Sequence, residues 1–190
     1  DEKNELVYLS VESPSSDYYG GHRPGDNLFA ESIVAVDLNT GEYKWHFQVV
    51  HHPLWGHDLS AAPLVMDVEI DGKMREILAV PTKQAMLFVF DRITGEPIWP
   101  IEEVAVPQGN VPGEWYSSTQ PRTMEKLNYG RSEMNVPEDL IDFTPEMHAQ
   151  ALKNLERWQW KEATLYNPPI LGDVNGMLGA IALGNSGGGT

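Results

Sequence analysis

A nine-residue motif that occurs twice constrains the fold of this chain more than any other feature. Asp37–Trp45 and Asp91–Trp99 both match the pattern D-x-x-T-G-E-x-x-W. Each copy follows a short apolar run, Ser32–Val36 in the first case and Met86–Phe90 in the second. Runs of this length, rich in β-branched and aromatic residues and closed by a turn signal, are typical of buried strands. The chain is therefore expected to fold from repeated β units.

The motif itself predicts a turn between two strands. Its Asp can accept hydrogen bonds from backbone amides two residues further on, and its Gly can adopt the positive φ that the turn requires. The Trp then falls in the following strand, where its large apolar face can fill the space between two stacked sheets. The alternative is an ordinary β-hairpin that happens to occur twice.

The rest of the chain predicts more strands, a long loop region and one helix. Four further segments have strand character: Glu5–Val11, Lys44–Val50, Ala62–Ile70 and Arg75–Pro81. Asp71-Gly72 is a hairpin signal between the last two. The region from Pro100 to Val136 is rich in proline, glycine and polar residues, which predicts a surface excursion and not a compact element.

A helix is predicted near residues 145–159. Thr144 can cap its N-terminus, Pro145 suits its first turn, and Glu146 favours the positive end of the helix dipole. Four apolar residues then recur at helical spacing: Met147, Ala151, Leu155 and Trp158. We expect this helix to pack on a sheet, without a role in chemistry.

Composition narrows the possible functions. The 190 residues suit one domain, and 41% hydrophobic with 22% charged residues indicates a chain that can build a core. Lys+Arg 13 against Asp+Glu 28 gives a net charge of −15, which repels phosphate backbones and predicts no nucleic-acid partner. The absence of cysteine excludes disulfides, thiolate metal sites and cysteine nucleophiles within these residues.

The densest polar cluster follows a predicted strand end. His51, His52, His57 and Asp58 lie within eight residues and could supply metal ligands or a general base. Their spacing matches neither H-E-x-x-H nor H-x-H-x-D-H. A structural hydrogen-bonding role is favoured for each histidine alone, whereas the segment as a whole is interpreted as a functional loop. A metal-dependent hydrolase built on these four residues is one hypothesis.

Two other polar positions are candidates. Lys83 stands between two apolar runs, so its side chain can point inward and would then need an anionic partner. The alternative is an ordinary solvated lysine. The glycine-rich segment SSDYYGGHRPGDN, which carries Asp17, His22, Arg23 and Asp26, is interpreted first as a structured turn and second as a site.

Specific sequence motifs resemble the membrane-type glucose dehydrogenase branch of the quinoprotein dehydrogenases. They are SIVAVDLNTGEYKWHFQVVHHPLWGHDLSAAP, PTKQAMLFVFDRITGEPIWPIEEVAVPQG and STQP. The resemblance implies an eight-bladed β-propeller of four-stranded sheets that binds pyrroloquinoline quinone (PQQ) and a divalent cation, usually calcium. We therefore expect residues 1–190 to form a mainly β, partial propeller domain of about three blades. A loop-rich and helical insertion is expected at about 100–165.

The resemblance also implies roles for individual residues. Lys83 matches the lysine that contacts the quinone oxygens in this family. The family's catalytic aspartate directly follows the Trp of H-H-x-L-W, and Gly56 occupies that position here. Asp58 matches a second family aspartate and is a candidate base if the loop shifts. Ser13 stands where related alcohol dehydrogenases have an asparagine metal ligand, and we assign no metal ligand in this chain.

Two functions follow from the resemblance. The first is oxidation of a sugar or alcohol by hydride transfer to bound PQQ, with electrons passed to a respiratory acceptor in the periplasm. The alternative is a non-catalytic propeller segment for binding or assembly, which lost the catalytic aspartate at Gly56. In either case a closed ring would need further chain segments or self-association with other copies.

Overall fold

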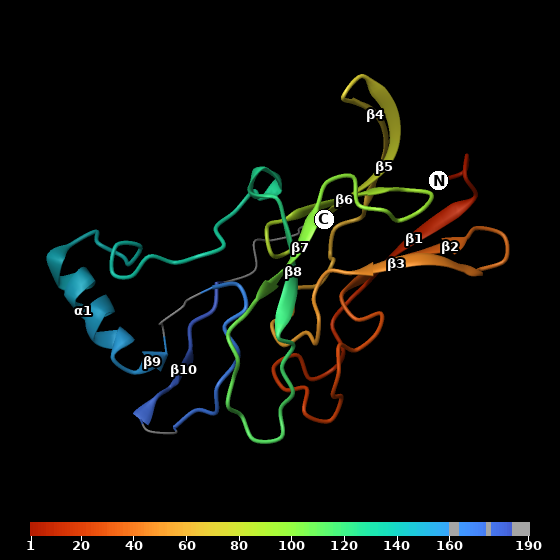
Figure 1. Ribbon diagram of the computed structural model, residues 1–190. Coiled ribbons are helices and arrows are strands. Elements are labelled where there is room, and N and C mark those ends of the chain that lie inside the picture. Colours follow the sequence, from red (N-terminus) through yellow and green to blue (C-terminus); the bar gives the residue numbers. More distant parts are fainter. Residues whose placement is uncertain (160–163, 174–175, 184–190) are drawn as a thin grey trace.

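The computed structural model describes residues 1–159, 164–173 and 176–183, which form a series of small β-sheets (Figure 1). The first sheet has the antiparallel order β1 (Leu6–Val11), β2 (Ser32–Asp37), β3 (Tyr43–Gln48). The second has the antiparallel order β4 (Leu64–Ile70), β5 (Lys73–Pro81), β6 (Leu87–Asp91). An isolated bridge between Phe90 and Pro97 extends the second sheet beyond β6.

Both copies of the repeated motif form the predicted turn. Asp37 Oδ1 accepts hydrogen bonds from the amides of Asn39 and Thr40, each at 3.0 Å. Asp91 Oδ1 accepts the equivalent bonds from Ile93 and Thr94, at 3.0 and 2.9 Å. Gly41 and Gly95 have φ values of 74° and 77°, which only glycine adopts without strain. The two copies of the motif therefore share a turn structure as well as a sequence pattern.

The first two sheets pack against each other through aromatic side chains. Phe47 on β3 contacts Phe90 on β6, with ring centroids 5.1 Å apart, and also contacts Phe88 at 5.8 Å. Phe88 and Phe90 are fully buried in the core that the two sheets share. Such aromatic pairs each add about 0.5–1.5 kcal/mol beyond the burial of their surface. The core thus joins the two repeats into one unit.

The tryptophans of the two motifs have different environments. Trp45 on β3 is buried over Gly95, so closely that a Cβ at residue 95 would lie 2.6 Å from its ring. Its indole N–H also donates to the carbonyl of Arg92 at 3.3 Å. Trp99 follows the second turn, is only half-buried and carries Lys126 Nζ 5.4 Å from its ring centroid. The predicted inter-sheet role is therefore observed for Trp45.

The region after Pro100 differs from the predicted surface excursion. Two of its segments, β7 (Ile101–Ala105) and β8 (Thr119–Thr123), pair as an antiparallel sheet. Gln120 on β8 is fully buried and bonds both backbone groups of His51, which attaches this sheet to the loop after β3. The prolines and glycines between the two strands obscured the strand pattern in the sequence, so the pairing was not predicted. A 3-10 helix, η1 (Glu125–Leu127), follows.

The predicted helix forms but ends earlier and stands apart from the large sheets (Figure 1). In α1 (Pro145–Leu155), the Thr144 side chain caps the amide of Met147 at 3.2 Å, as expected. Trp158 lies beyond the helix in β9 (Trp158–Gln159), which pairs in parallel with β10 (Gly179–Ala180). α1 contacts β9, a strand of the small β9–β10 sheet, in keeping with the expected packing of the helix on a sheet. No described helix has the length and apolarity needed to cross a membrane.

Candidate functional site

An ion pair joins two sequence-predicted site residues from different loops. Lys83 lies in the turn between β5 and β6, and Asp58 lies in the loop that follows β3. Lys83 Nζ donates to Asp58 Oδ2 at 2.8 Å and to the carbonyl of Gly56 at 3.3 Å. Both side chains are largely shielded from solvent. Lys83 therefore has the anionic partner that an inward-pointing lysine needs.

The ion pair continues into a buried acid through Ser13. The Ser13 amide donates to Asp58 Oδ1 at 2.8 Å, and the Ser13 hydroxyl donates to Glu31 Oε1. Glu31 directly precedes β2 and is fully buried. We call Ser13, Glu31, Asp58 and Lys83 the polar cluster.

The two carboxyl groups of the polar cluster have opposite pKa shifts. Burial raises the pKa of Glu31 to about 8, against the lowering effect of its bond from Ser13. Burial also acts to raise the pKa of Asp58, but the hydrogen bonds from Lys83 and Ser13 outweigh it and hold that pKa below its ordinary value. At neutral pH the cluster therefore holds a protonated Glu31 beside an ionised Asp58.

Gly56 has a backbone conformation that a larger residue would not adopt easily. Its φ is +64°, in the left-handed region that favours glycine. Among the residues that the structure describes, a Cβ built at this position would have one neighbour within 4 Å, Asp17 Oδ2 at 3.7 Å. The space beside Gly56 thus faces a carboxylate of the glycine-rich loop.

The histidines of the predicted cluster separate into different environments. His51 Nε2 lies 3.0 Å from Glu103 Oε1, and His52 Nε2 lies 3.0 Å from Glu114 Oε1 in a buried pair. His52 Nδ1 bonds the carbonyl of Gly25 at 2.7 Å, which anchors the glycine-rich loop. These contacts support the predicted structural roles for His51 and His52.

His57 is the third histidine, and it lies in an aromatic wall beside the polar cluster. Its ring stacks on Trp55 at 6.0 Å between centroids and 18° between planes, and Tyr166 meets it edge-on at 5.9 Å. Burial and the charge of Lys83 lower the pKa of His57 to about 4, so its imidazole is neutral at pH 7. Its buried Nδ1 has no hydrogen-bond partner within the described part of the chain.

Within residues 1–159, 164–173 and 176–183, no group of three or more His, Asp or Glu side chains is arranged to hold a metal ion. The described geometry therefore gives no support to the hydrolase hypothesis. Sequence reasoning missed Glu31 and Glu114. The signal for Glu31 was its position beside the buried strand β2, because a glutamate is seldom found inside the core without a partner.

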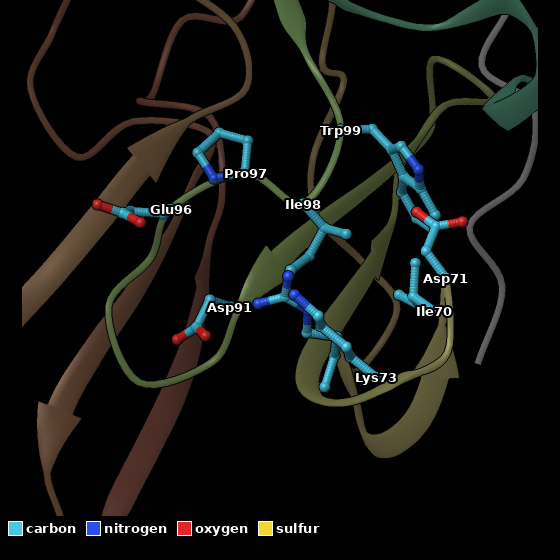
Figure 2. A pocket seen from close by; sticks show the side chains of 9 residues that line it. Ile70, Asp71, Lys73, Asp91, Glu96, Pro97, Ile98 and Trp99 are labelled. Atoms are coloured by element: carbon cyan, nitrogen blue, oxygen red, sulfur yellow. The ribbon is translucent and has the colours of Figure 1, made fainter.

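A separate cavity of about 430 Å³ lies at the turn of the second repeat. Figure 2 shows Glu96, Pro97, Ile98 and Trp99 after β6 on one side and the β4–β5 hairpin on the other. Lys73, Arg75, Asp71 and Asp91 make this cavity charged. None of its lining residues belongs to the polar cluster.

Repeated antiparallel sheets that pack face to face through a motif tryptophan define part of a β-propeller. The family described as glucose/ethanol/alcohol dehydrogenase, beta-propeller domain (PQQ) matches residues 1–190. The chain therefore belongs to the PQQ β-propeller family, which confirms the predicted resemblance and fold class.

The matched relatives are much longer than this chain. Quinoprotein glucose dehydrogenase of Gluconobacter oxydans is 42% identical over 129 residues, which cover 67% of this chain and 16% of that protein. Quinate/shikimate dehydrogenase (quinone) of Acinetobacter baylyi is 34% identical over 147 residues, 76% of this chain and 18% of that protein. The solved quinohemoprotein alcohol dehydrogenase from Comamonas testosteroni matches 66% of this chain and 19% of its own, at 27% identity and a TM-score of 0.50.

Proposed function

We propose that this chain forms part of the cofactor-binding face of a dehydrogenase that oxidises a sugar or alcohol with PQQ as the electron acceptor. The observation that carries the proposal is Lys83, a shielded cation oriented by Asp58, in a chain that matches the PQQ family along its whole length. When bound, PQQ supplies the redox chemistry by accepting hydride. The residues of the chain would bind the cofactor, orient it and accept protons.

Lys83 is the proposed cofactor contact. An ammonium group has three donors, and Asp58 and Gly56 accept two of them. The third can donate to an anionic oxygen, and the positive charge stabilises negative charge that develops on that oxygen. Partial burial strengthens this effect because screening by water is reduced. The residues present therefore fit an anionic, oxygen-rich cofactor.

Asp58 is the candidate base, and its main proposed role is to orient Lys83. Its lowered pKa keeps the carboxylate ionised at neutral pH, so it can accept a proton from a substrate hydroxyl. The same low pKa makes it a weak acceptor compared with a base that titrates near the working pH. Proton transfer to Asp58 is thus expected to be slow.

The calcium ion implied by the resemblance is not matched by these residues alone. Ser13, Glu31 and Asp58 offer oxygen atoms, but no group of three or more His, Asp or Glu side chains in the described segments is arranged to hold a metal ion. Calcium prefers six to eight oxygen ligands, and the Lys83 ammonium lies directly beside Asp58. No step of the proposed reaction is assigned to a metal.

A non-catalytic propeller segment is the second candidate function. Gly56 favours it, because the family's catalytic aspartate would stand at this position and glycine has no side chain that could accept a proton. In this case the chain would keep its strands and Lys83 but lack the base.

The remaining features of the proposal rest on the family. We propose one partial propeller domain over residues 1–190, with the insertion at about 100–165, although residues 160–163 lie outside the described segments. Electrons would pass to a respiratory acceptor, and the protein would act in the periplasm. Other chain segments or further copies would complete the ring.

Turnover distinguishes the two candidate functions. The chain is reconstituted with PQQ and Ca²⁺, and dye reduction is followed with a panel of aldoses and alcohols. Slow reduction that Asp58→Asn abolishes would support the dehydrogenase. Bound PQQ without dye reduction, and reduction gained in Gly56→Asp, would instead indicate a segment that lost its base.

A further inference from the structure

The charged cavity of about 430 Å³ lies at the opposite end of the second sheet from the polar cluster. Lys73 begins β5 and lines the cavity, whereas Lys83 lies in the turn that follows the other end of β5. β6 returns from that turn and ends at Asp91, which also lines the cavity. The cavity is therefore a separate site, and its volume falls within the range of small-molecule sites, roughly 300–1,000 Å³.

The two copies of the repeated motif differ in charge at the position before their tryptophan. In the first copy this residue is Lys44, whose Nζ lies 3.2 Å from Asp37 Oδ2. In the second copy it is Ile98, and Asp91, the equivalent of Asp37, forms no ion pair with any described residue. The first copy thus supplies its own ammonium group, and the second copy leaves this place open to a cation from outside the turn.

The turn fixes the carboxylate of Asp91 in place. Its Oδ1 accepts hydrogen bonds from the amides of Ile93 and Thr94, at 3.0 and 2.9 Å. The Asp91 amide closes the turn by donating to the carbonyl of Glu96 at 2.8 Å. No described residue donates to Asp91 Oδ2, the atom equivalent to the one that meets the lysine in the first copy. A carboxylate fixed in this way loses little freedom when an ammonium group binds.

Two cations on β5 also line the cavity. Lys73 and Arg75 form no ion pair with a described residue, although three acids line the same cavity: Asp71, Asp91 and Glu96. Figure 2 shows Lys73 on the β4–β5 hairpin and Glu96 on the turn after β6. Charges of opposite sign that remain apart across a cavity can each pair with a ligand that carries both signs.

The rest of the lining is largely apolar. Ile70, Ile98 and Trp99 line the cavity and pack against the small buried cluster between β5 and β6. The Ile98 amide donates to the carbonyl of Val89 on β6 at 2.9 Å, which attaches this lining to the sheet. An apolar group of a ligand would gain free energy by leaving water for this surface.

We propose that the charged cavity binds a compact zwitterion with a primary ammonium group, a carboxylate and an apolar side chain, such as a free aromatic or branched α-amino acid. The ammonium group pairs with Asp91, as the lysine of the first copy pairs with its aspartate. The carboxylate pairs with Lys73 and Arg75, and the side chain lies on the apolar lining. A zwitterion has no net charge, so the chain's net charge of −15 does not repel it. This inference goes beyond the proposed function and involves neither the quinone nor the polar cluster.

The test follows the indole N–H signal of Trp99 by NMR as L-phenylalanine is added to the chain without quinone. The chain has six tryptophans, and the signal that Trp99→Phe removes belongs to residue 99. We expect a saturable shift of this signal. 2-Phenylethylamine lacks the carboxylate and 3-phenylpropanoate lacks the ammonium group. Each should bind at least fivefold more weakly, because one charge-assisted hydrogen bond is lost.

Variants at the two copies of the motif test the ammonium position. Ile98→Lys reproduces the first copy and should weaken L-phenylalanine binding at least tenfold, whereas Ile98→Met, of similar size and uncharged, should retain it. Asp91→Asn keeps an oxygen for the turn amides and should weaken binding at least fivefold. Lys44→Ile makes the reverse change in the first copy and should leave the affinity unchanged.

Near-ultraviolet circular dichroism reports whether each variant is folded, and Asp91→Asn decides the matter if Ile98→Lys is not. The proposal would be overturned by the absence of a saturable Trp99 shift, or by equal affinity for L-phenylalanine and either of its two analogues. Unchanged affinity in folded Ile98→Lys or in Asp91→Asn would also overturn it. PQQ binding is measured separately, so its failure would leave this result intact.

Discussion

The ammonium of Lys83 lies 2.8 Å from a carboxylate oxygen of Asp58, although the two residues come from loops of different sheets. The pair therefore contributes to the stability of the loops as well as to the proposed site. Asp58→Asn would leave a shielded lysine without its charge partner. We expect a loss of about 1–3 kcal/mol in the free energy of unfolding, measured by urea denaturation. Arg131→Gln, which removes the exposed partner of the Arg131–Asp139 pair, should cost less than about 1 kcal/mol. An equal loss of unfolding free energy in the two variants would contradict the predicted contribution of the Lys83–Asp58 pair to stability.

Gly95 is expected to be the most sensitive glycine of the repeated motif. In Gly95→Ala, the new methyl group meets both the left-handed backbone and the Trp45 ring, 2.6 Å away. We expect a loss of roughly 2–4 kcal/mol in unfolding free energy. Gly41→Ala is the matched control, because residue 41 has a similar φ and no described residue lies within 4 Å of the new atom. Its cost should be only about 1 kcal/mol, and a similar cost at both positions would exclude tight packing at Trp45.

The buried carboxyl group of Glu31 should make the folded chain less stable as the pH rises. Its folded pKa of about 8 lies above the ordinary value of 4.5, so the native chain keeps a proton that the unfolded chain releases between these values. Stability attributable to Glu31 should therefore fall as pH rises across this window, by up to about 1.4 kcal/mol per pH unit. Glu31→Gln keeps the shape and should flatten this slope in urea midpoints measured from pH 6.5 to 8, above the range in which His57 contributes. An unchanged slope, or the same flattening in exposed Glu12→Gln, would contradict this account.

The buried imidazole of His57 should make the folded chain less stable as the pH falls. Its folded pKa of about 4 lies below the ordinary value of 6.5, so the unfolded chain binds a proton that the native chain excludes. Stability should fall as pH decreases from 6.5 toward 4. His57→Gln removes the titrating group, so the thermal midpoint of the variant, taken relative to that of the parent chain at the same pH, should rise as the pH falls through this range. His46→Gln, at a half-buried histidine bonded to Tyr43, should leave the profile unaltered.

The strands and turns were predictable because their signals are local. The Asp of the repeat bonds amides two and three residues away, and Asp71-Gly72 forms the hairpin turn from adjacent residues. The Trp45–Gly95 contact joins residues from the two copies, and nothing in either copy alone specifies it. The β7–β8 pair was missed for a similar reason, since its buried Gln120 gains its role only from His51.

The candidate site was partly predictable. An isolated lysine between apolar runs implied an anionic partner, but the sequence did not identify Asp58 over other acids. Glu31 acquires its raised pKa from burial by residues distant in sequence, and His57 acquires its neutral state in the same way. Such shifts depend on packing, which no local motif encodes.

The most direct test of the proposed function is PQQ binding to the chain, followed by difference absorbance during titration with the quinone. The account predicts saturable binding that is at least tenfold weaker in Lys83→Met. Lys73→Met removes one positive charge at the separate charged cavity and should bind PQQ like the parent chain. No saturable binding by the parent chain, or equal affinity in Lys83→Met, would contradict the role assigned to Lys83.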